Sequence, residues 1–228
     1  NEQGQGSHNV TVVVKDSGGL NSTQSFAIFV ENINDVPFVN SSPVLNATED
    51  SMYIYDADGH DDDFKTINPI EINYYSLDSA PSGMEINDTN GIVKWTPTNE
   101  QAFKEHNVVM KVVDLSGAFN IQNFTVFVAN VNDAPVFYGI ENKTVKENQT
   151  LSFKLAATDI DPTNDTLTFS TDADSVLPSG FSIDVNSGLF AWTPTFEDSG
   201  TYIISFNVSD GNMYDAATLR INAKYLNM

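Results

Sequence analysis

The stretch NVNDAPVF at residues 130–137 decides how this chain is organised, and NINDVPF at residues 32–38 repeats its pattern. Both follow a β-rich run, FTVFVAN at 124–130 and FAIFVEN at 26–32. Each supplies two Asn side chains and one Asp side chain, followed by a Pro that cannot continue a strand ladder. An oxygen-rich segment that ends in Pro and lies between two β-rich regions is typical of a joint whose angle is fixed.

The sequence contains an internal repeat. HNVTVVVKDSGG at residues 8–19 aligns with HNVVMKVVDLSG at 106–117. PSGMEINDTNGIVKWTPT at 81–98 aligns with PSGFSIDVNSGLFAWTPT at 178–195. A period of about 97 residues is too long for a solenoid unit and fits one β-sandwich domain.

The repeat predicts three parts along the chain. Residues 1–37 are expected to hold the last two strands of a β domain and a linker, and residues 38–134 and 135–228 are expected to form one whole domain each. The first part is either the end of a longer array or a strand pair that completes its sheet with another molecule. Lys224 and Tyr225 stand where a third acidic linker would begin, so we expect the array to end there.

Short alternating segments predict strands throughout both whole domains. Apolar and polar residues alternate at 150–155, 166–170 and 200–208, and Gly, Asn, Asp and Pro separate these segments. No segment carries a convincing helical period of 3.6 residues. We therefore predict an all-β chain of tandem β-sandwiches.

Composition narrows the function classes. The 31 acidic and 10 basic residues give a net charge of −21, which repels nucleic acid and anionic membranes and favours cations. Hydrophobic residues make up 40% of the chain and include 15 Phe, so real cores can form. The absence of Cys excludes disulfides and thiolate chemistry. No apolar run approaches the roughly 20 residues that would insert across a bilayer.

The two linkers resemble the interdomain linkers of cadherins and of bacterial and archaeal cadherin-like repeats. The block that runs from PSG to WTPT in each domain is similar to the Putative Ig and dystroglycan-type cadherin-like repeats of prokaryotic, above all archaeal, surface proteins. The resemblance implies Ig-like, cadherin-like Greek-key sandwiches, Ca²⁺ at the joints and a cell-surface location. It implies other cadherin-like domains, a cell-surface protein or a glycan as partners. Trp95 and Trp192, at equivalent positions, are interpreted as core residues.

The cadherin pattern assigns calcium ligands from both domains and from the linker at each joint. For the joint at 130–135 it implies Glu49, with Asp50 as its alternate, and Glu100, Asn130, Asn132, Asp133, Asp159, Asp161 and Asp210. For the joint at 32–37 it implies Asn32, Asn34, Asp35, Asp56, Asp58 and Asp114. Each linker begins with Asn instead of the family's Asp, and the mid-domain acidic motif is only partly kept. These departures imply weaker binding or about one or two ions per joint.

A physical argument supports calcium without the family. Carboxylates gathered at a joint repel one another by roughly 1 kcal/mol or more per pair, so such a cluster binds a cation, takes up protons or splays apart. Calcium accepts roughly six to eight oxygen ligands, including carboxylates, amides and backbone carbonyls. The alternative is an acidic turn cluster that binds no ion.

Ten N-x-S/T sequons predict glycosylation. They are Asn9, Asn21, Asn40, Asn46, Asn87, Asn123, Asn142, Asn148, Asn164 and Asn207. A glycosylated chain indicates a cell-surface protein of an archaeon or a eukaryote, and the absence of Cys favours the archaeon.

No catalytic motif stands out, so we predict that the chain is not an enzyme. The leading hypothesis is a calcium-rigidified extracellular module of an adhesin, stalk or surface-layer protein. One alternative is a subunit of an extracellular filament that is assembled by strand complementation through residues 1–37. Another alternative is a carbohydrate-binding appendage of a secreted enzyme, in which Trp95 would stack on the sugar.

Overall fold

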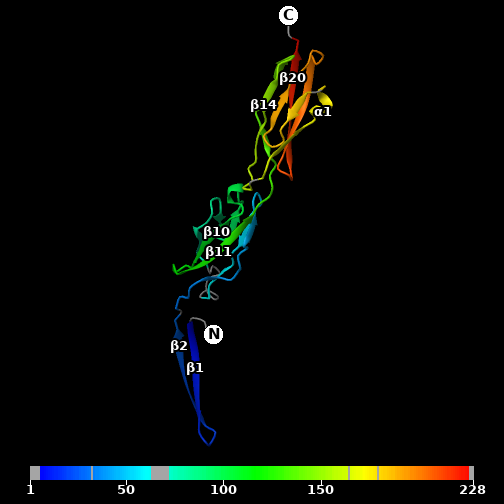
Figure 1. Ribbon diagram of the computed structural model, residues 1–228. Helices are drawn as coiled ribbons and strands as arrows, with labels where there is room; N and C mark the ends of the chain where they lie inside the picture. The colour runs from blue at the N-terminus through cyan, green and yellow to red at the C-terminus, as the bar shows by residue number, and fades with distance from the viewer. Residues whose placement is uncertain (1–5, 32, 63–71, 164, 179, 226–228) are drawn as a thin grey trace. The chain divides into compact units, whose positions relative to one another are not determined.

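The computed structural model describes residues 6–31, 33–62, 72–163, 165–178 and 180–225. Two predicted site residues, Asn32 and Asn164, lie outside these described ranges. The chain divides into two compact units. Unit 1 comprises Asn1–Pro97 and Lys104–Val128, and unit 2 comprises Thr98–Phe103 and Ala129–Met228 (Figure 1). Each unit is described by itself.

The chain is all-β, as predicted. Within the described ranges every element is a strand except η1 (Asn99–Gln101), a 3₁₀ turn, and α1 (Ala173–Val176), a single helical turn. No helix in this part of the chain is long and apolar enough to cross a membrane. The predicted fold class of tandem Ig-like β-sandwiches is confirmed.

The hairpin of β1 (Gly6–Lys15) and β2 (Asn21–Val30) opens unit 1 and forms a two-stranded sheet of its own (Figure 1). Its register pairs Val10 with Phe26 and His8 with Ile28. We call the side of the hairpin that carries six apolar residues the inner hairpin face. These residues are Val10, Val12, Val14, Phe26, Ile28 and Val30.

The rest of unit 1 is a sandwich of two main sheets. One sheet has the order β4 (Asn46–Thr48), β11 (Phe119–Ala129), β10 (Glu105–Val113) and β7 (Tyr74–Ser79). The other has the order β5 (Tyr53–Asp56), β9 (Ile92–Trp95) and β8 (Glu85–Ile86), and β3 (Phe38–Val39) pairs with β6 (Gly59–His60). Alternate residues of β9, β10 and β11 face inward, which buries Val93, Met110 and Val126 completely.

Unit 2 repeats this architecture strand for strand. Its first sheet has the order β13 (Lys143–Lys146), β20 (Tyr214–Lys224), β19 (Gly200–Ser209) and β16 (Thr168–Thr171), with β13 parallel to β20. Its second sheet has the order β14 (Leu151–Lys154), β18 (Leu189–Trp192) and β17 (Phe181–Ile183), and β12 (Val136–Tyr138) pairs with β15 (Ala156–Thr158). The core gathers Phe190, Trp192, Ile204, Phe206 and Ile221.

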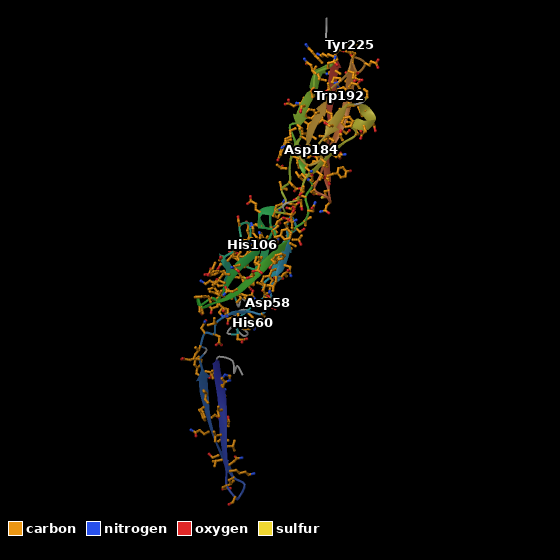
Figure 2. The ribbon with its side chains drawn as sticks, viewed as in Figure 1. Asp58, His60, His106, Asp184, Trp192 and Tyr225 are labelled. Carbon is orange, nitrogen blue, oxygen red and sulfur yellow. The ribbon has the colours of Figure 1, made fainter. Side chains whose placement is uncertain are left out.

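Both tryptophans are core residues, as predicted. Trp95 is 2% exposed and Trp192 is fully buried, and Figure 2 shows Trp192 among the strands of unit 2. Each packs edge-on against an aromatic ring at the start of the next long strand. The ring centroids of Trp95 and His106 are 5.1 Å apart, and those of Trp192 and Tyr202 are 5.2 Å apart. Because neither indole is exposed, neither can stack on a sugar in the folded chain.

Candidate metal centre at the 130–135 linker

Asp210 lies in the turn between β19 and β20 and anchors the linker within unit 2. Its Oδ1 accepts hydrogen bonds from the backbone N–H of Asn212 and Met213, at 2.6 and 2.7 Å. Its Oδ2 accepts one from Nδ2 of Asn132 at 2.9 Å. The N–H of Met213, the amide of Asn132 and the N–H of Asn212 hold the pKa of Asp210 below its ordinary value, so this carboxylate is ionised at neutral pH.

Asp161 holds the linker from a second direction within the same unit. It follows β15 and is 8% exposed. Its Oδ1 accepts a hydrogen bond from Nδ2 of Asn130 at 2.9 Å, and its Oδ2 accepts one from the backbone N–H of Asp133 at 2.7 Å. The N–H of Asp161 donates to Oδ1 of Asp159 at 3.0 Å, which places the second carboxylate beside it. The structure therefore gathers six predicted ligands of this joint around one linker, namely Asn130, Asn132, Asp133, Asp159, Asp161 and Asp210.

Asn99 is a functional candidate that the sequence reasoning missed. It begins η1, which belongs to unit 2, and its Nδ2 donates to Oδ2 of Asp133 at 2.5 Å. The neighbouring Glu100, chosen as the nearest acidic residue, is exposed. An amide oxygen is as acceptable to calcium as a carboxylate oxygen, so Asn99 is a chemically suitable ligand that a choice restricted to acidic residues passes over.

Two buried oxygens at the linker have no hydrogen-bond donor. They are Oδ1 of Asn130 and Oδ2 of Asp159, and each is shielded from solvent. A buried oxygen without a donor costs about 1–3 kcal/mol, which a bound cation would recover. The donor set of amides, carboxylates and backbone carbonyls is that of a hard cation and therefore fits calcium.

The described residues do not present a ready-made carboxylate cage. Among them, no group of three or more His, Cys, Asp or Glu side chains is arranged to hold a metal ion. The Nδ2 groups of Asn99, Asn130 and Asn132 instead point at carboxylates. Rotating an Asn amide by half a turn exchanges its nitrogen and oxygen within nearly the same volume, so these side chains can present oxygen to an ion.

Glu49 and Asp50 belong to unit 1 and differ in their surroundings. Glu49 follows β4 and is completely buried, whereas Asp50 is exposed. Asp50 adopts a left-handed backbone with φ of 56°, and its N–H donates to the carbonyl of Pro97. In unit 2, Glu147 is likewise buried and is followed by Asn148 with φ of 59°. Of the two alternates, Glu49 is the one held in a fixed, buried position.

The 32–37 linker is tied to unit 1 by the same contact that Asn132 makes in unit 2. Nδ2 of Asn34 donates to Oδ2 of Asp114 at 2.8 Å and to the carbonyl of Asp35 at 2.7 Å. Asp114 is completely buried, and its Oδ1 accepts the N–H groups of Ser116 and Ala118. The predicted ligand Asn32 lies outside the described residues.

Strand register places a different aspartate at this linker from the ones predicted. Phe38 pairs with His60 in β3 and β6, and Val136 pairs with Thr158 in β12 and β15. The residue after each pair is Asp61 in unit 1 and Asp159 in unit 2, so these two are equivalent. Asp61 is completely buried.

The positions of Asp56 and Asp58 therefore do not match the D-x-D pair of unit 2, and their role as calcium ligands stays a prediction. Asp56 ends β5 and pairs with Ile92 of β9, and both aspartates are exposed. Burial, followed by the charges of Asp58 and Asp56, raises the pKa of Tyr75. Within the sandwich of unit 1, Asp58 and His60 lie together near one end, and His106 lies farther from that end (Figure 2).

The sequons within the described residues lie at the surface. Asn9, Asn21, Asn40, Asn46, Asn87, Asn123, Asn142 and Asn148 are exposed, and Asn207 is half-buried. Asn164 lies outside the described residues. An exposed side chain is the minimum requirement for attaching a glycan.

Two family matches cover most of the chain. Residues 36–129 match the family described as "Putative Ig domain", and residues 132–222 match the family described as "Bacterial Ig domain". No protein with a curated description matches the sequence.

Solved structures with a similar fold are cadherin domains. Protocadherin Gamma B2 extracellular cadherin domains 1–5 matches with a TM-score of 0.56 and 20% identity over 98% of this chain and 47% of that chain. Human mucin-like protocadherin EC1-2 matches with a TM-score of 0.51 and 18% identity over 83% of this chain and 98% of that chain. Protocadherin gammaB7 EC3-6, solved as a cis-dimer, matches with a TM-score of 0.50 and 17% identity over 95% and 58%.

The chain spans less than half the length of the first solved structures it matches. At these identities the likeness concerns the fold. Together with the two family matches, the strand order and the repeated linker contacts lead to one conclusion. Residues 36–222 hold two successive Ig-like repeats with a cadherin-like β-sandwich fold.

Proposed function

We propose that this chain is a non-catalytic extracellular module in which calcium at the linkers stiffens successive cadherin-like sandwiches of an adhesin, stalk or surface-layer protein. The observation that carries the proposal is the convergence of Asp161 and Asp210 on the linker residues Asn130 to Asp133, with Asp159 bonded to the backbone of Asp161. Two of the oxygens gathered there are buried without a donor.

The charge balance of unit 2 favours a cation at this linker. Within the described residues, hydrogen bonds join Asp133, Asp159, Asp161 and Asp210 in one network, and the donors in this network are neutral amides and backbone N–H groups. Carboxylates this close repel one another by on the order of 1 kcal/mol or more per pair. A divalent cation neutralises that repulsion, whereas an amide only reduces it. The ion would be held by Asn130, Asn132, Asp133, Asp159, Asp161 and Asp210. Asn99 would be an additional oxygen donor.

Stiffening follows from where the ligands lie in sequence. The linker residues are the chain that connects the two sandwiches, so fixing them to β15 and to the β19–β20 turn removes backbone freedom at the joint. Partners of the stiffened module are other cadherin-like domains of the same or neighbouring chains, and a cell-surface protein or a glycan at the far end. Glycans on the exposed sequons would shield the sides.

The test is a calcium titration of the whole chain, followed by thermal unfolding and by small-angle scattering. We expect calcium to raise Tm and to lengthen the particle relative to excess chelator. Asp161→Asn should abolish both responses.

Asp184→Asn is the matched control. Oδ1 of Asp184 accepts the N–H groups of Asn186 and Ser187, and the equivalent Oδ1 of Asn87 in unit 1 accepts those of Thr89 and Asn90. The control should therefore fold and respond to calcium as the unchanged protein does. The proposal is overturned if calcium changes neither the Tm nor the dimensions of the wild-type protein.

A second candidate function is a filament subunit, and the hairpin β1–β2 favours it. On the inner hairpin face, Val12 and Val14 are 51% and 67% exposed, and Phe26 is 45% exposed. The equivalent Met110, Val112 and Phe124 of β10 and β11 are buried in their sandwich. A two-stranded hairpin is only marginally stable alone, so this face needs a covering sheet. This function predicts that the wild-type chain associates as its concentration rises and that Phe26→Ser and Val12→Thr remove the association. A wild-type chain that stays monomeric at all concentrations would contradict it.

A further inference from the structure

The outer face of the sheet β13-β20-β19-β16 has a charge opposite to that of the chain. These four strands contain one acidic residue, Asp215, although the chain holds 31. Asp215 does not lie on the outer face, because it shares the opposite side of β20 with the buried Leu219 and Ile221, and its Oδ2 accepts the N–H of Phe137. The same strands contain four of the chain's 10 basic residues, namely Lys143, Lys146, Arg220 and Lys224.

Three of these basic side chains share the outer face, which we call the basic face. In β20 the odd-numbered Leu219, Ile221 and Ala223 are buried, so the even-numbered Arg220 and Lys224 point outward. Lys146 of β13 is exposed and pairs with Lys224 across the parallel ladder. Figure 2 places Tyr225, which follows Lys224, at the end of this strand. Lys143 lies instead over the ring of Phe153.

The basic residues gain nothing from one another or from nearby carboxylates. Neighbouring strands lie about 4.8 Å apart, and like charges opposite each other destabilise a sheet. The ion pair found within the described ranges is His60–Asp62, in unit 1. A positive face that is costly to the isolated chain and is not neutralised inside it indicates a binding surface for an anion.

We propose that the basic face binds an acidic surface on a second copy of this chain. A second copy fits because the chain is strongly acidic. It carries a net −21, and it exposes Asp56 and Asp58 at the end of β5. Register does not place these two carboxylates at the position of Asp159, so they stand apart from the pattern of ligands proposed for the linkers. Residues two apart on an extended chain stand about 6.5–7 Å from each other, a spacing that lets two carboxylates address the Lys146–Lys224 pair.

The contact would join two different surfaces, unit 2 of one copy and unit 1 of the next. Such a heterologous contact does not close on itself in pairs, so copies would associate into open rows. This proposal does not depend on calcium at the linkers. Its test is therefore performed in excess chelator, so that the two proposals fail separately. The protein is unglycosylated, so that a glycan at Asn142 or Asn207 cannot cover the basic face.

The experiment is sedimentation equilibrium of the whole chain at low and at high salt. We expect salt-sensitive self-association that weakens at least tenfold, about 1.4 kcal/mol, in Lys146→Glu/Lys224→Glu and equally in Asp56→Lys/Asp58→Lys. Mixing the two variants should restore association, because each then offers the surface that matches the other. Circular dichroism melts identify any variant that fails to fold, and Lys154→Glu, on the other sheet, is the matched control.

Three outcomes would overturn the proposal. One is a wild-type chain that stays monomeric at low salt. Another is a mixture of the two folded variants that does not associate. The third is binding of a sulfated polysaccharide by the wild type, lost in Lys146→Glu/Lys224→Glu, without any self-association. That third result would assign the basic face to an anionic glycan.

Discussion

Asn132 donates a hydrogen bond from Nδ2 to Oδ2 of Asp210 over 2.9 Å, and Asn34 makes the same bond to Oδ2 of Asp114 over 2.8 Å. In both repeats the amide comes from the linker and the carboxylate comes from the turn of the last hairpin of the sandwich that follows. Each amide also donates to the carbonyl of the next residue. Each linker is therefore fastened to the sandwich on its C-terminal side, even without an ion.

The first prediction concerns this fastening. Asn34→Ala removes a donor from a completely buried carboxylate, which should lower the stability of unit 1 by about 1–2 kcal/mol in chelator. Chemical unfolding measures the loss. Asn40→Ala is the control, because Asn40 is exposed and its backbone N–H alone bonds to Asp58. Equal stability of the two variants would show that the Asn34–Asp114 bond contributes nothing.

The second prediction concerns the aspartate that serves the 32–37 linker. If calcium binds there, Asp61→Asn should remove the ion held by this linker, because Asp61 occupies the position of Asp159. Asp58→Asn should keep the full stoichiometry, since Asp58 is exposed and lies three residues earlier. Isothermal titration calorimetry distinguishes the two variants by the number of ions bound. The reverse pattern would return the ligand role to Asp58.

The loop around Asp61 shows what sequence could and could not supply. The run DADGHDDD offers two D-x-D pairs in sequence, Asp56 with Asp58 and Asp61 with Asp63, and inspection favoured the first. The offset of 98 residues between the two linkers, seen from Asn32 to Asn130, also leads from Asp61 to Asp159 and would have resolved the choice. The strand alternation was sufficient for the all-β class because side-chain burial with a period of two follows directly from strand geometry.

The linker network could be predicted only in part. The repeat shows which polar residues accompany each linker. It therefore predicts the part of the network formed by Asn130, Asn132, Asp133, Asp161 and Asp210. Asn99 does not, because a short 3₁₀ turn brings it to Asp133 across 34 residues of chain. The choice between Glu49 and Asp50 likewise needed the left-handed backbone that turns Asp50 outward.

The third prediction uses the two tryptophans, both buried in the sandwich cores. Iodide should quench the native fluorescence hardly at all and should quench it strongly after unfolding, because the charged quencher cannot enter a packed core. Sugars should leave the emission unchanged. Trp192→Phe should destabilise unit 2 by about 2–3 kcal/mol, because it leaves a cavity beside Tyr202. Emission that shifts on adding a glycan would revive the carbohydrate-binding alternative.

The last prediction is a loss of stability at alkaline pH that is centred on Tyr53. Burial, with a smaller contribution from Tyr55, raises the pKa of Tyr53 from 10.0 to about 12. The folded state therefore favours the neutral phenol, whose O–H donates to the carbonyl of Val44 at 2.7 Å. This stabilisation is complete below pH 10 and is lost as the pH rises toward 12. Tyr53→Phe should be less stable than the wild type at neutral pH, because it lacks this hydrogen bond, but its stability should fall less between pH 10 and 12. Unfolding curves at several pH values, with absorbance at 295 nm to follow phenolate, provide the measurement. Parallel alkaline profiles for the two proteins would mean that Tyr53 ionises as freely in the folded chain as in the unfolded one.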